Sequence, residues 1–278
     1  MDDDRDCIAF FDSGIGGLTL LRECAANLPD EKFVYLGDNA RAPYGNKSAE
    51  EIKTLTAQAF AYLARFPLKA AVVACNTVTA DCIGFLRERF GFPILGVEPA
   101  VKPAAKRGGT VLVLSTAATA SSARFQALLD RWSGAARLIP YSPTSLAGEI
   151  EKNISDLSRL DLSVLLPKVQ CDAVVLGCTH YIFVKKRIED FYGCRAYDGN
   201  VGTAARLAAT VGAASAGRAK NFARKEKISK GNFAGKSADL ISKNTNKCSI
   251  LRKNGKKTVV LFVGESAEKN KSVFESLF

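Results

Sequence analysis

Two cysteines occupy positions in the sequence that suit proton-transfer chemistry. Cys75 ends the apolar run AVVAC, and Cys178 ends the similar run AVVLGC. Each run is rich in β-branched residues and is followed by small polar residues and then a helical pattern. This order is typical of a buried parallel strand that ends at the carboxyl edge of a sheet. The cysteines lie 103 positions apart, and the same offset relates Asp12 to Ser115. We therefore predict two related halves facing one cleft, with a thiol on each wall, as a reaction that runs in mirror image requires.

Cysteine also has a simpler interpretation, because it is a small residue that packs well in protein cores. The chain has eight cysteines, no CxxC pair and a single histidine, so a zinc site or a redox dithiol is not expected. Without an export signal the thiols are expected to be reduced. Six of the cysteines are interpreted as structural, namely Cys7, Cys24, Cys82, Cys171, Cys194 and Cys248.

Polar residues follow both cysteines directly. His180 is the only histidine and lies two residues after Cys178, where it can set the ionisation of that thiol; a structural role is the alternative. Thr179 in one turn, and Asn76 and Thr77 in the other, offer amide and hydroxyl groups beside the free backbone N–H groups of a helix start. We expect these residues to hold a substrate's carboxylate and ammonium groups between the thiols.

The glycine-rich turn DSGIGG at 12–17 lies between an expected strand and an expected helix, where backbone N–H groups attract an anion. Asp38 follows the next strand as a ribose-binding acid would in a dinucleotide site. However, the glycine spacing is GxGG rather than GxGxxG, and Asp12 would repel a pyrophosphate. We favour Asp12 as a group that handles protons or tunes a thiol, with a turn-capping carboxylate as the alternative. Ser13 beside it belongs to the same candidate site.

A long loop follows the second expected strand, GDNARAPYGNK at 37–47. Loops longer than a simple connection are often functional. A rigid proline and the flexible Gly45 flank Tyr44, so Tyr44 and Gly45 are candidates for shaping a pocket.

Length and composition indicate a globular protein. The chain has 278 residues, of which 47% are hydrophobic, and this length suits roughly two domains. The acidic start MDDDRDCIAF carries no signal-peptide pattern, and no run of about 20 apolar residues is present to span a bilayer. We therefore expect a cytoplasmic protein.

The positive charge is concentrated in one segment. Residues 218–257 carry 13 Lys or Arg and 2 acidic residues, a net charge of +11 that equals the charge of the whole chain. The segment has few apolar residues and no periodicity, which is typical of a loop-rich or poorly ordered insertion. A solvated face is favoured over contact with nucleic acid or an anionic surface.

Strand, loop and helix patterns alternate along the chain, which favours two doubly wound α/β lobes with mostly parallel sheets and the site in the cleft between them. Strands are expected at Cys7–Phe11, Phe33–Leu36, Ala70–Ala74, Pro93–Gly96, Val111–Leu114, Arg137–Ile139, 173–177, up to Tyr197, and Thr258–Val263. Helices are expected at Leu18–Asn27, after Ser48, at Thr79–Phe90, 122–132, 144–153 and 157–168, up to Tyr192, through Val211, and at Ala267–Leu277.

The two lobes are expected to be pseudo-symmetric. The predicted first lobe comprises residues 1–98 and 213–278, with the basic insertion at 218–257, and the second lobe comprises 99–212.

Five motifs, in order, resemble those of the glutamate racemases in the cofactor-independent aspartate/glutamate racemase superfamily. They are DSGIGGL, GDNARAPYGNKS, ACNTVTA, GVEPAVKPA and LGCTHY. The resemblance covers roughly residues 7–211 and resumes at the closing stretch TVVLFVGESAEKNKSVFESLF.

The resemblance implies interconversion of L- and D-glutamate, supplying D-glutamate for peptidoglycan and the cell wall. Cys75 and Cys178 match the two catalytic cysteines, and the family pattern assigns deprotonation of D-glutamate to Cys75 and of L-glutamate to Cys178. Asp12 and His180 match the assisting groups, and a further assisting glutamate corresponds to Glu151, with Glu149 as a rival. The substrate-binding positions are Asp12, Ser13, Tyr44, Gly45, Asn76, Thr77, Thr179 and His180.

The chemistry implied is a two-base proton transfer. An unperturbed thiol has a pKa of about 8.5, far below that of an amino acid's α-proton, so the site must raise the thiolate population and stabilise a carbanion. One cysteine would enter as thiolate and the other as thiol. Neither a metal nor pyridoxal phosphate is expected, so the expected cofactor is none.

Other functions stay open at this stage. A racemase acting on aspartate or another amino acid would share these motifs, and a regulatory relative could use the basic segment to bind nucleic acid. The resemblance also implies a homodimer. Retention of both cysteines favours an enzyme.

Overall fold

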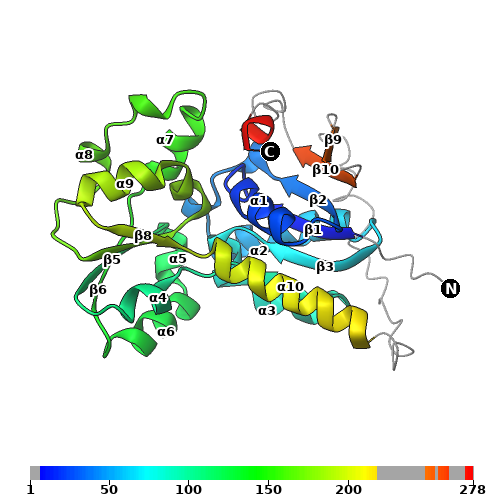
Figure 1. The fold of residues 1–278 in the computed structure, drawn as a ribbon, viewed down its shortest axis with the longest axis horizontal. Coiled ribbons are helices and arrows are strands. Elements are labelled where there is room, and N and C mark those ends of the chain that lie inside the picture. The colour runs from blue at the N-terminus through cyan, green and yellow to red at the C-terminus, as the bar shows by residue number, and fades with distance from the viewer. Residues whose placement is uncertain (1–6, 218–247, 254–255, 263–272, 278) are drawn as a thin grey trace.

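Two α/β lobes lie side by side in the computed structural model, which describes residues 7–217, 248–253, 256–262 and 273–277 (Figure 1). The first lobe contains a six-stranded sheet with the order β4-β3-β1-β2-β10-β9. All neighbouring strands are parallel except β9, which is antiparallel to β10. The strands are β1 Cys7–Asp12, β2 Lys32–Gly37, β3 Leu68–Val73, β4 Ile94–Gly96, β9 Cys248–Lys253 and β10 Lys256–Phe262.

The second lobe contains a four-stranded sheet with the order β6-β5-β7-β8, in which all pairs are parallel. Its strands are β5 Thr110–Ser115, β6 Arg137–Tyr141, β7 Ala173–Gly177 and β8 Arg195–Asp198. The doubly wound α/β class predicted from the sequence is therefore confirmed.

Helices cover the faces of both sheets. The α-helices are α1 Leu18–Asn27, α2 Ala49–Leu63, α3 Asn76–Arg89, α4 Val101–Ala105, α5 Ala117–Ser121, α6 Ala123–Trp132, α7 Leu146–Lys152, α8 Leu162–Leu165, α9 Lys185–Tyr192 and α10 Asn200–Gly217. Short 3₁₀ turns are η1 Asn39–Arg41, η2 Tyr44–Asn46, η3 Leu157–Arg159 and η4 Thr179–Val184. Residues 273–277 are also helical. None of the helices in the described ranges is long and apolar enough to cross a membrane.

The central strands are buried on both faces, which explains their continuous apolar runs. All six residues of β1 are buried. Its alternate side chains enter two separate cores: Phe11 packs with Phe60 of α2, whereas Phe10 packs with Leu20 of α1. The second sheet likewise separates two cores. Because each central strand is fixed from both sides, the residues at its carboxyl end have defined positions.

Several predicted elements differ from the structure. The helix expected from Thr79 begins at Asn76, so Cys75 is its N-cap residue. The single helix expected at 157–168 is replaced by η3 and α8. Part of the expected final helix lies outside the described residues.

The basic segment contains an element that its composition did not predict. Residues 248–253 form the edge strand β9, paired with β10, so the expectation of an insertion without regular structure was wrong there. Residues 218–247 and 254–255 lie outside the described part of the chain.

The limits of the two lobes remain our proposal. Helix α10 contributes Ala204, Leu207 and Val211 to the core that also holds Phe10 and Leu20. This helix therefore packs with the first sheet. We propose that the chain returns to the first lobe near Gly199, rather than at residue 213 as expected from the sequence.

Candidate active site

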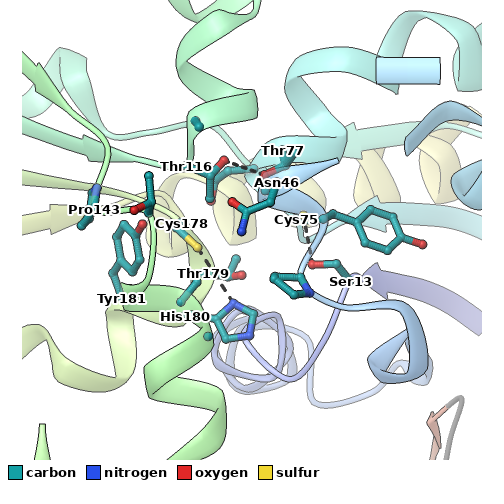
Figure 2. A pocket seen from close by; sticks show the side chains of 18 of the residues that line it. Ser13, Asn46, Cys75, Thr77, Thr116, Pro143, Cys178, Thr179, His180 and Tyr181 are labelled. Atoms are coloured by element: carbon teal, nitrogen blue, oxygen red, sulfur yellow. Dashed lines mark hydrogen bonds between the residues drawn. The ribbon is translucent and has the colours of Figure 1, made fainter. Parts of the chain in front are cut away.

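A cavity of about 240 Å³ lies between the two lobes and is lined by residues of both. Both cysteines line it: Cys75 lies two residues after the end of β3, and Cys178 directly follows β7. Figure 2 shows these two cysteines on opposite sides of the cavity. The parallel sheets bring both turns here, because the carboxyl ends of parallel strands share an edge.

Cys75 is buried at the start of α3, where backbone N–H groups and the helix dipole favour a thiolate. The Ser13 hydroxyl lies 3.5 Å from its sulfur. Burial and the nearby Asp12 carboxylate raise the pKa of the Cys75 thiol to about 12, although Ser13 and the backbone N–H of Val78 act in the opposite direction. At neutral pH these surroundings therefore favour the protonated thiol.

Asp12 ends β1 and is fully buried. Its Oδ2 accepts a hydrogen bond of 2.8 Å from the backbone N–H of Gly17, while Oδ1 has no hydrogen-bond partner among the described residues. Burial raises the pKa of Asp12, and His180 and the Gly17 N–H oppose the rise. Asp12 is not among the residues that line the cavity, so it is buried away from the cavity surface.

Cys178 is paired with the histidine. Nδ1 of His180 lies 3.9 Å from the Cys178 sulfur, and Nε2 lies 3.2 Å from Oε2 of Glu151. The second contact is an ion pair when the ring is protonated, but it lacks the geometry of a hydrogen bond. Burial acts to lower the pKa of His180, but Cys178 and Glu151 together raise it well above its ordinary value. These two neighbours therefore favour the protonated form of the ring beside the second thiol.

The structure distinguishes the two candidate glutamates. Glu151 contacts His180, whereas Glu149 lines the cavity and lies 3.8 Å from Lys152. Only Glu151 therefore has the geometry to support His180, and Glu149 faces the space where a ligand would bind.

The remaining predicted residues also gather at the cavity, which Ser13, Tyr44, Gly45, Asn76, Thr77 and Thr179 all line. The buried Nδ2 of Asn76 has no hydrogen-bond partner among the described residues, so it is available to a ligand. No lysine or arginine is among the described residues lining the cavity. A bound carboxylate would therefore be held by hydroxyl, amide and backbone N–H groups.

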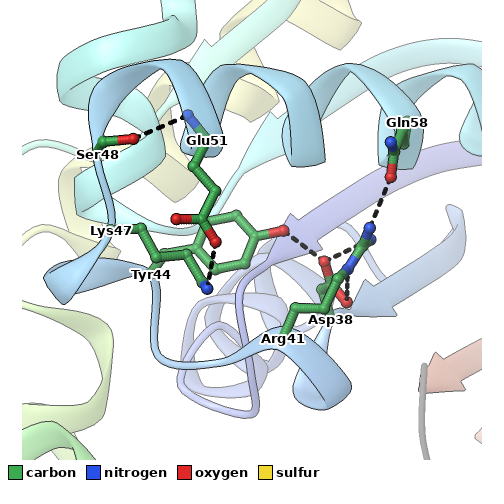
Figure 3. Close-up of polar contacts among 7 residues, drawn as sticks. All are labelled: Asp38, Arg41, Tyr44, Lys47, Ser48, Glu51 and Gln58. Carbon is green, nitrogen blue, oxygen red and sulfur yellow. Dashed lines mark hydrogen bonds and ion pairs between the residues drawn. The ribbon is translucent and has the colours of Figure 1, made fainter.

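Tyr44 is held from the side away from the cavity. Its hydroxyl donates to Asp38, and Arg41 pairs with the same carboxylate and donates to Gln58 (Figure 3). The Ser48 cap on the N–H of Glu51 begins α2 as its sequence pattern predicted. Asp38 therefore anchors the loop through Tyr44 and Arg41. This role does not fit the interpretation of Asp38 as a ribose-binding acid in a dinucleotide site.

Sequence reasoning missed several residues at the site. Thr116 lines the cavity, and its hydroxyl lies 2.9 Å from that of Thr77. The 103-residue offset from Ser13 leads to Thr116, so a signal was present. Asn39 was also missed: its Nδ2 donates to Oε1 of Glu151 over 2.7 Å, and nothing local to its sequence indicates this contact. Other cavity residues outside the prediction are Pro43, Asn46, Ala117, Pro143, Thr144, Ser145, Ala147, Gly148 and Tyr181.

Two α/β lobes that present one thiol each to a shared cavity define a class of enzyme that can act on both faces of one carbon atom. The sequence comparison agrees with this class. Residues 18–207 match the Asp/Glu/Hydantoin racemase family, and the chain belongs to that family. It is an isomerase of the amino-acid racemase type, as the motifs predicted.

Known relatives are similar over most of the chain. The glutamate racemase of Clostridium novyi is 38% identical over 218 residues, which cover 74% of this chain and 84% of the relative. The Escherichia coli glutamate racemase, solved with L-glutamate and the activator UDP-MurNAc-ala, has a TM-score of 0.67 and 31% identity, covering 75% of this chain and 83% of that one. The Francisella tularensis glutamate racemase, solved with D-glutamate, has a TM-score of 0.63 and 29% identity, covering 76% and 83%.

Proposed function

We propose that this chain interconverts L- and D-glutamate and supplies D-glutamate for peptidoglycan synthesis. The observation that carries the proposal is that Cys75 and Cys178, from different lobes, line one cavity. The solved relatives named above bind L-glutamate and D-glutamate respectively, and they support glutamate as the substrate here.

In the proposed reaction the substrate's α-carbon lies between the two sulfurs. One cysteine, as thiolate, takes the α-proton, and the electron pair of the broken C–H bond remains on the substrate as a carbanion. The opposite cysteine, as thiol, then delivers its proton to the other face. The enzyme ends in the complementary protonation state, ready to run in reverse, and no cofactor or metal takes part in these steps.

The assisting groups are proposed from their contacts. Asp12 lies close enough to Cys75 to affect its ionisation, and we assign it to proton handling at that thiol. His180 contacts Cys178 and Glu151 contacts His180, so this pair would serve the second thiol. The substrate's carboxylate would bind the polar groups of Ser13, Asn76, Thr77 and Thr179, with Tyr44, Gly45 and His180 completing the site.

Heavy water provides the test of this function. The purified chain is incubated with L-glutamate and, separately, D-glutamate without added cofactor, and optical rotation and α-deuterium are followed. Because the proton-donating thiol exchanges with solvent, the first product molecules should carry deuterium while the remaining substrate stays unlabelled. Loss of rotation on aspartate with a higher kcat/KM than on glutamate would favour the alternative substrate, and no exchange with either amino acid would refute the proposal.

The cellular setting is also part of the proposal. We expect a homodimer acting in the cytoplasm, where cell-wall precursors are made, and the resemblance to the family supports this. Sedimentation of the purified chain measures the oligomer, and a monomer across the working concentration range would contradict it. A nucleic-acid partner is not proposed.

A further inference from the structure

A series of side-chain contacts runs from the first lobe to the second thiol. Asn39, in η1 of the first lobe, donates from Nδ2 to Oε1 of Glu151, in α7 of the second lobe, over 2.7 Å. The other carboxylate oxygen of Glu151 lies 3.2 Å from Nε2 of His180, and Nδ1 of His180 lies 3.9 Å from the sulfur of Cys178. The amide of Asn39 is thus connected to the thiol through two intervening side chains.

We propose that Asn39 is a positioning residue that prepares Cys178 for proton transfer by holding Glu151 against His180. Because Asn39 and Glu151 belong to different lobes, this contact forms only when the lobes lie together. The second thiol is therefore supported by a residue of the opposite lobe. The inference rests on the proposed function, since it assigns a role within that reaction.

The orientation of the Asn39 amide follows from the chemistry of its partner. An ionised carboxylate only accepts hydrogen bonds, so the NH₂ group of Asn39, rather than its carbonyl oxygen, must face Glu151. The carbonyl oxygen of Asn39 is buried and has no hydrogen-bond partner among the described residues. The amide therefore gains from facing Glu151 and would lose that hydrogen bond if it turned over.

Glu151 needs this restraint. Its side chain is 23% exposed, so a rotation towards solvent would hydrate the carboxylate and weaken its contact with His180. A hydrogen bond between an amide and a carboxylate is stronger than one between neutral groups. With Oε1 held by Asn39, Oε2 stays on the His180 side.

The first lobe also covers the Glu151–His180 pair. A Cβ atom added to Gly14 would lie 3.0 Å from Oε1 of Glu151 and 3.2 Å from Nε2 of His180. There is thus no space for water between Gly14 and the pair.

Asn39 does not line the cavity, so its role is separable from substrate binding. Cys75 has different neighbours, Ser13 and Asp12, and no hydrogen bond or ion pair within the described ranges connects it to Asn39. A loss of Asn39 should therefore affect Cys178 more strongly than Cys75, which Glu151 reaches only indirectly through Asp12. A general loosening of the site would instead change both thiols.

The test combines kinetics with labelling of each thiol. The variants are Asn39→Ala and the isosteric Asn39→Asp, which removes the donor and places a carboxylate beside Glu151. The control is Gln58→Ala, which removes a different anchor of the same loop, the acceptor of Arg41. Racemisation is followed with glutamate, and iodoacetamide labelling of Cys75 and Cys178 is followed in the free protein by peptide mass spectrometry.

Both Asn39 variants should lower kcat by about tenfold to a hundredfold, the size expected for one hydrogen bond to a charged group, with KM nearly unchanged. Labelling of Cys178 should slow by a similar factor, labelling of Cys75 should change much less, and Gln58→Ala should resemble wild type. Unchanged Cys178 labelling in Asn39→Asp, or equal slowing at both cysteines, would overturn the inference. Labelling requires no turnover, so wild type that fails to racemise glutamate would refute the proposed function while the labelling still decides the role of Asn39.

Discussion

The hydroxyl of Ser13 lies 3.5 Å from the sulfur of Cys75, which gives the first thiol a neutral hydrogen-bonding neighbour. The second thiol, Cys178, has the imidazole of His180 instead. The two halves of the site are therefore related in backbone position but differ in chemistry. The proposed reaction is symmetric in its outcome, whereas the means of producing each thiolate are not.

Ser13→Ala should make the Cys75 thiol harder to ionise. The Ser13 contact lowers the pKa of Cys75 against the effects of burial and Asp12, which together raise it to about 12. Without the hydroxyl the pKa rises further, so less thiolate is present at any pH below it. Iodoacetamide labelling of Cys75 should slow by about tenfold, as for the loss of one hydrogen bond, and Cys178 serves as the internal control. Faster labelling of Cys75 would contradict this account.

Asp12→Asn should stabilise the fold and impair catalysis. Burial raises the pKa of Asp12, so folding is penalised at neutral pH, where the unfolded chain carries the charge, and the penalty disappears below the unfolded pKa. Asparagine can still accept from the Gly17 N–H. The melting temperature at neutral pH should rise by about 2–4 °C for each ~1 kcal/mol recovered.

The same variant should lose about 10²-fold or more in kcat, as expected for removal of a proton-handling group. The gain in melting temperature should vanish in acid, where wild-type Asp12 is protonated in both states. An Asp12→Asn variant that is less stable at neutral pH, or fully active, would show that the carboxylate has another role.

Gly16→Ala should separate the lobes. A Cβ atom at Gly16 would clash with the Thr179 side chain and lie 2.8 Å from the backbone nitrogen of His180, both on the opposite lobe. The matched control is Gly84→Ala, because no atom lies within 4 Å of its added Cβ and alanine favours the helix by about 0.5–1 kcal/mol. Gly16→Ala should raise KM and lower kcat with circular dichroism unchanged, whereas Gly84→Ala should keep full activity. Equal kinetics for the two variants would argue against a tight closed site.

A pair of thiols at the amino-terminal end of the second sheet should form a disulfide. The half-buried Cys171 and Cys194 have sulfurs 3.8 Å apart. With oxidised glutathione, one thiolate displaces glutathione to give a mixed disulfide, and the second thiolate then displaces the remaining glutathione. Burial raises the pKa of Cys171 to about 12 and also raises that of Cys194, so the reaction should be slow at neutral pH and faster in alkali.

The resulting loop contains Cys178, and closing a loop of this size should stabilise the fold by about 3 kcal/mol. Urea unfolding with and without oxidation measures the gain, and Cys171→Ser is the control that cannot cross-link. Mass spectrometry that finds only mixed disulfides would contradict the predicted pairing.

The strand-end cysteines could be predicted from the sequence because buried parallel strands are continuous apolar runs and polar residues follow them directly. The structure of the segment 157–168 could not be predicted in this way, because the periodicity of its apolar residues resembles that of one helix. In the structure these residues pack against one face of the second sheet from η3 and α8. Strand β9 lies in a segment whose composition is that of a loop. It is a strand because its backbone pairs with that of β10, a contact that composition does not reveal.

The partners of the second thiol needed the tertiary structure. Glu149 and Glu151 are two residues apart on one short helix, so they project from nearly opposite sides of it, and the sequence does not show which side faces His180. Asn39 is separated from Glu151 by 112 positions. The packing of the two lobes against each other brings these side chains together.

The central claim, that Cys75 and Cys178 act as opposite bases, is tested most directly by the variants Cys75→Ser and Cys178→Ser. Circular dichroism first checks that each variant is folded. Racemisation is then assayed starting from L-glutamate and, separately, from D-glutamate. The account predicts that each variant loses full racemisation in both directions, because a serine hydroxyl cannot replace a thiol as base or proton donor at neutral pH. Either variant turning over at the wild-type rate would contradict it.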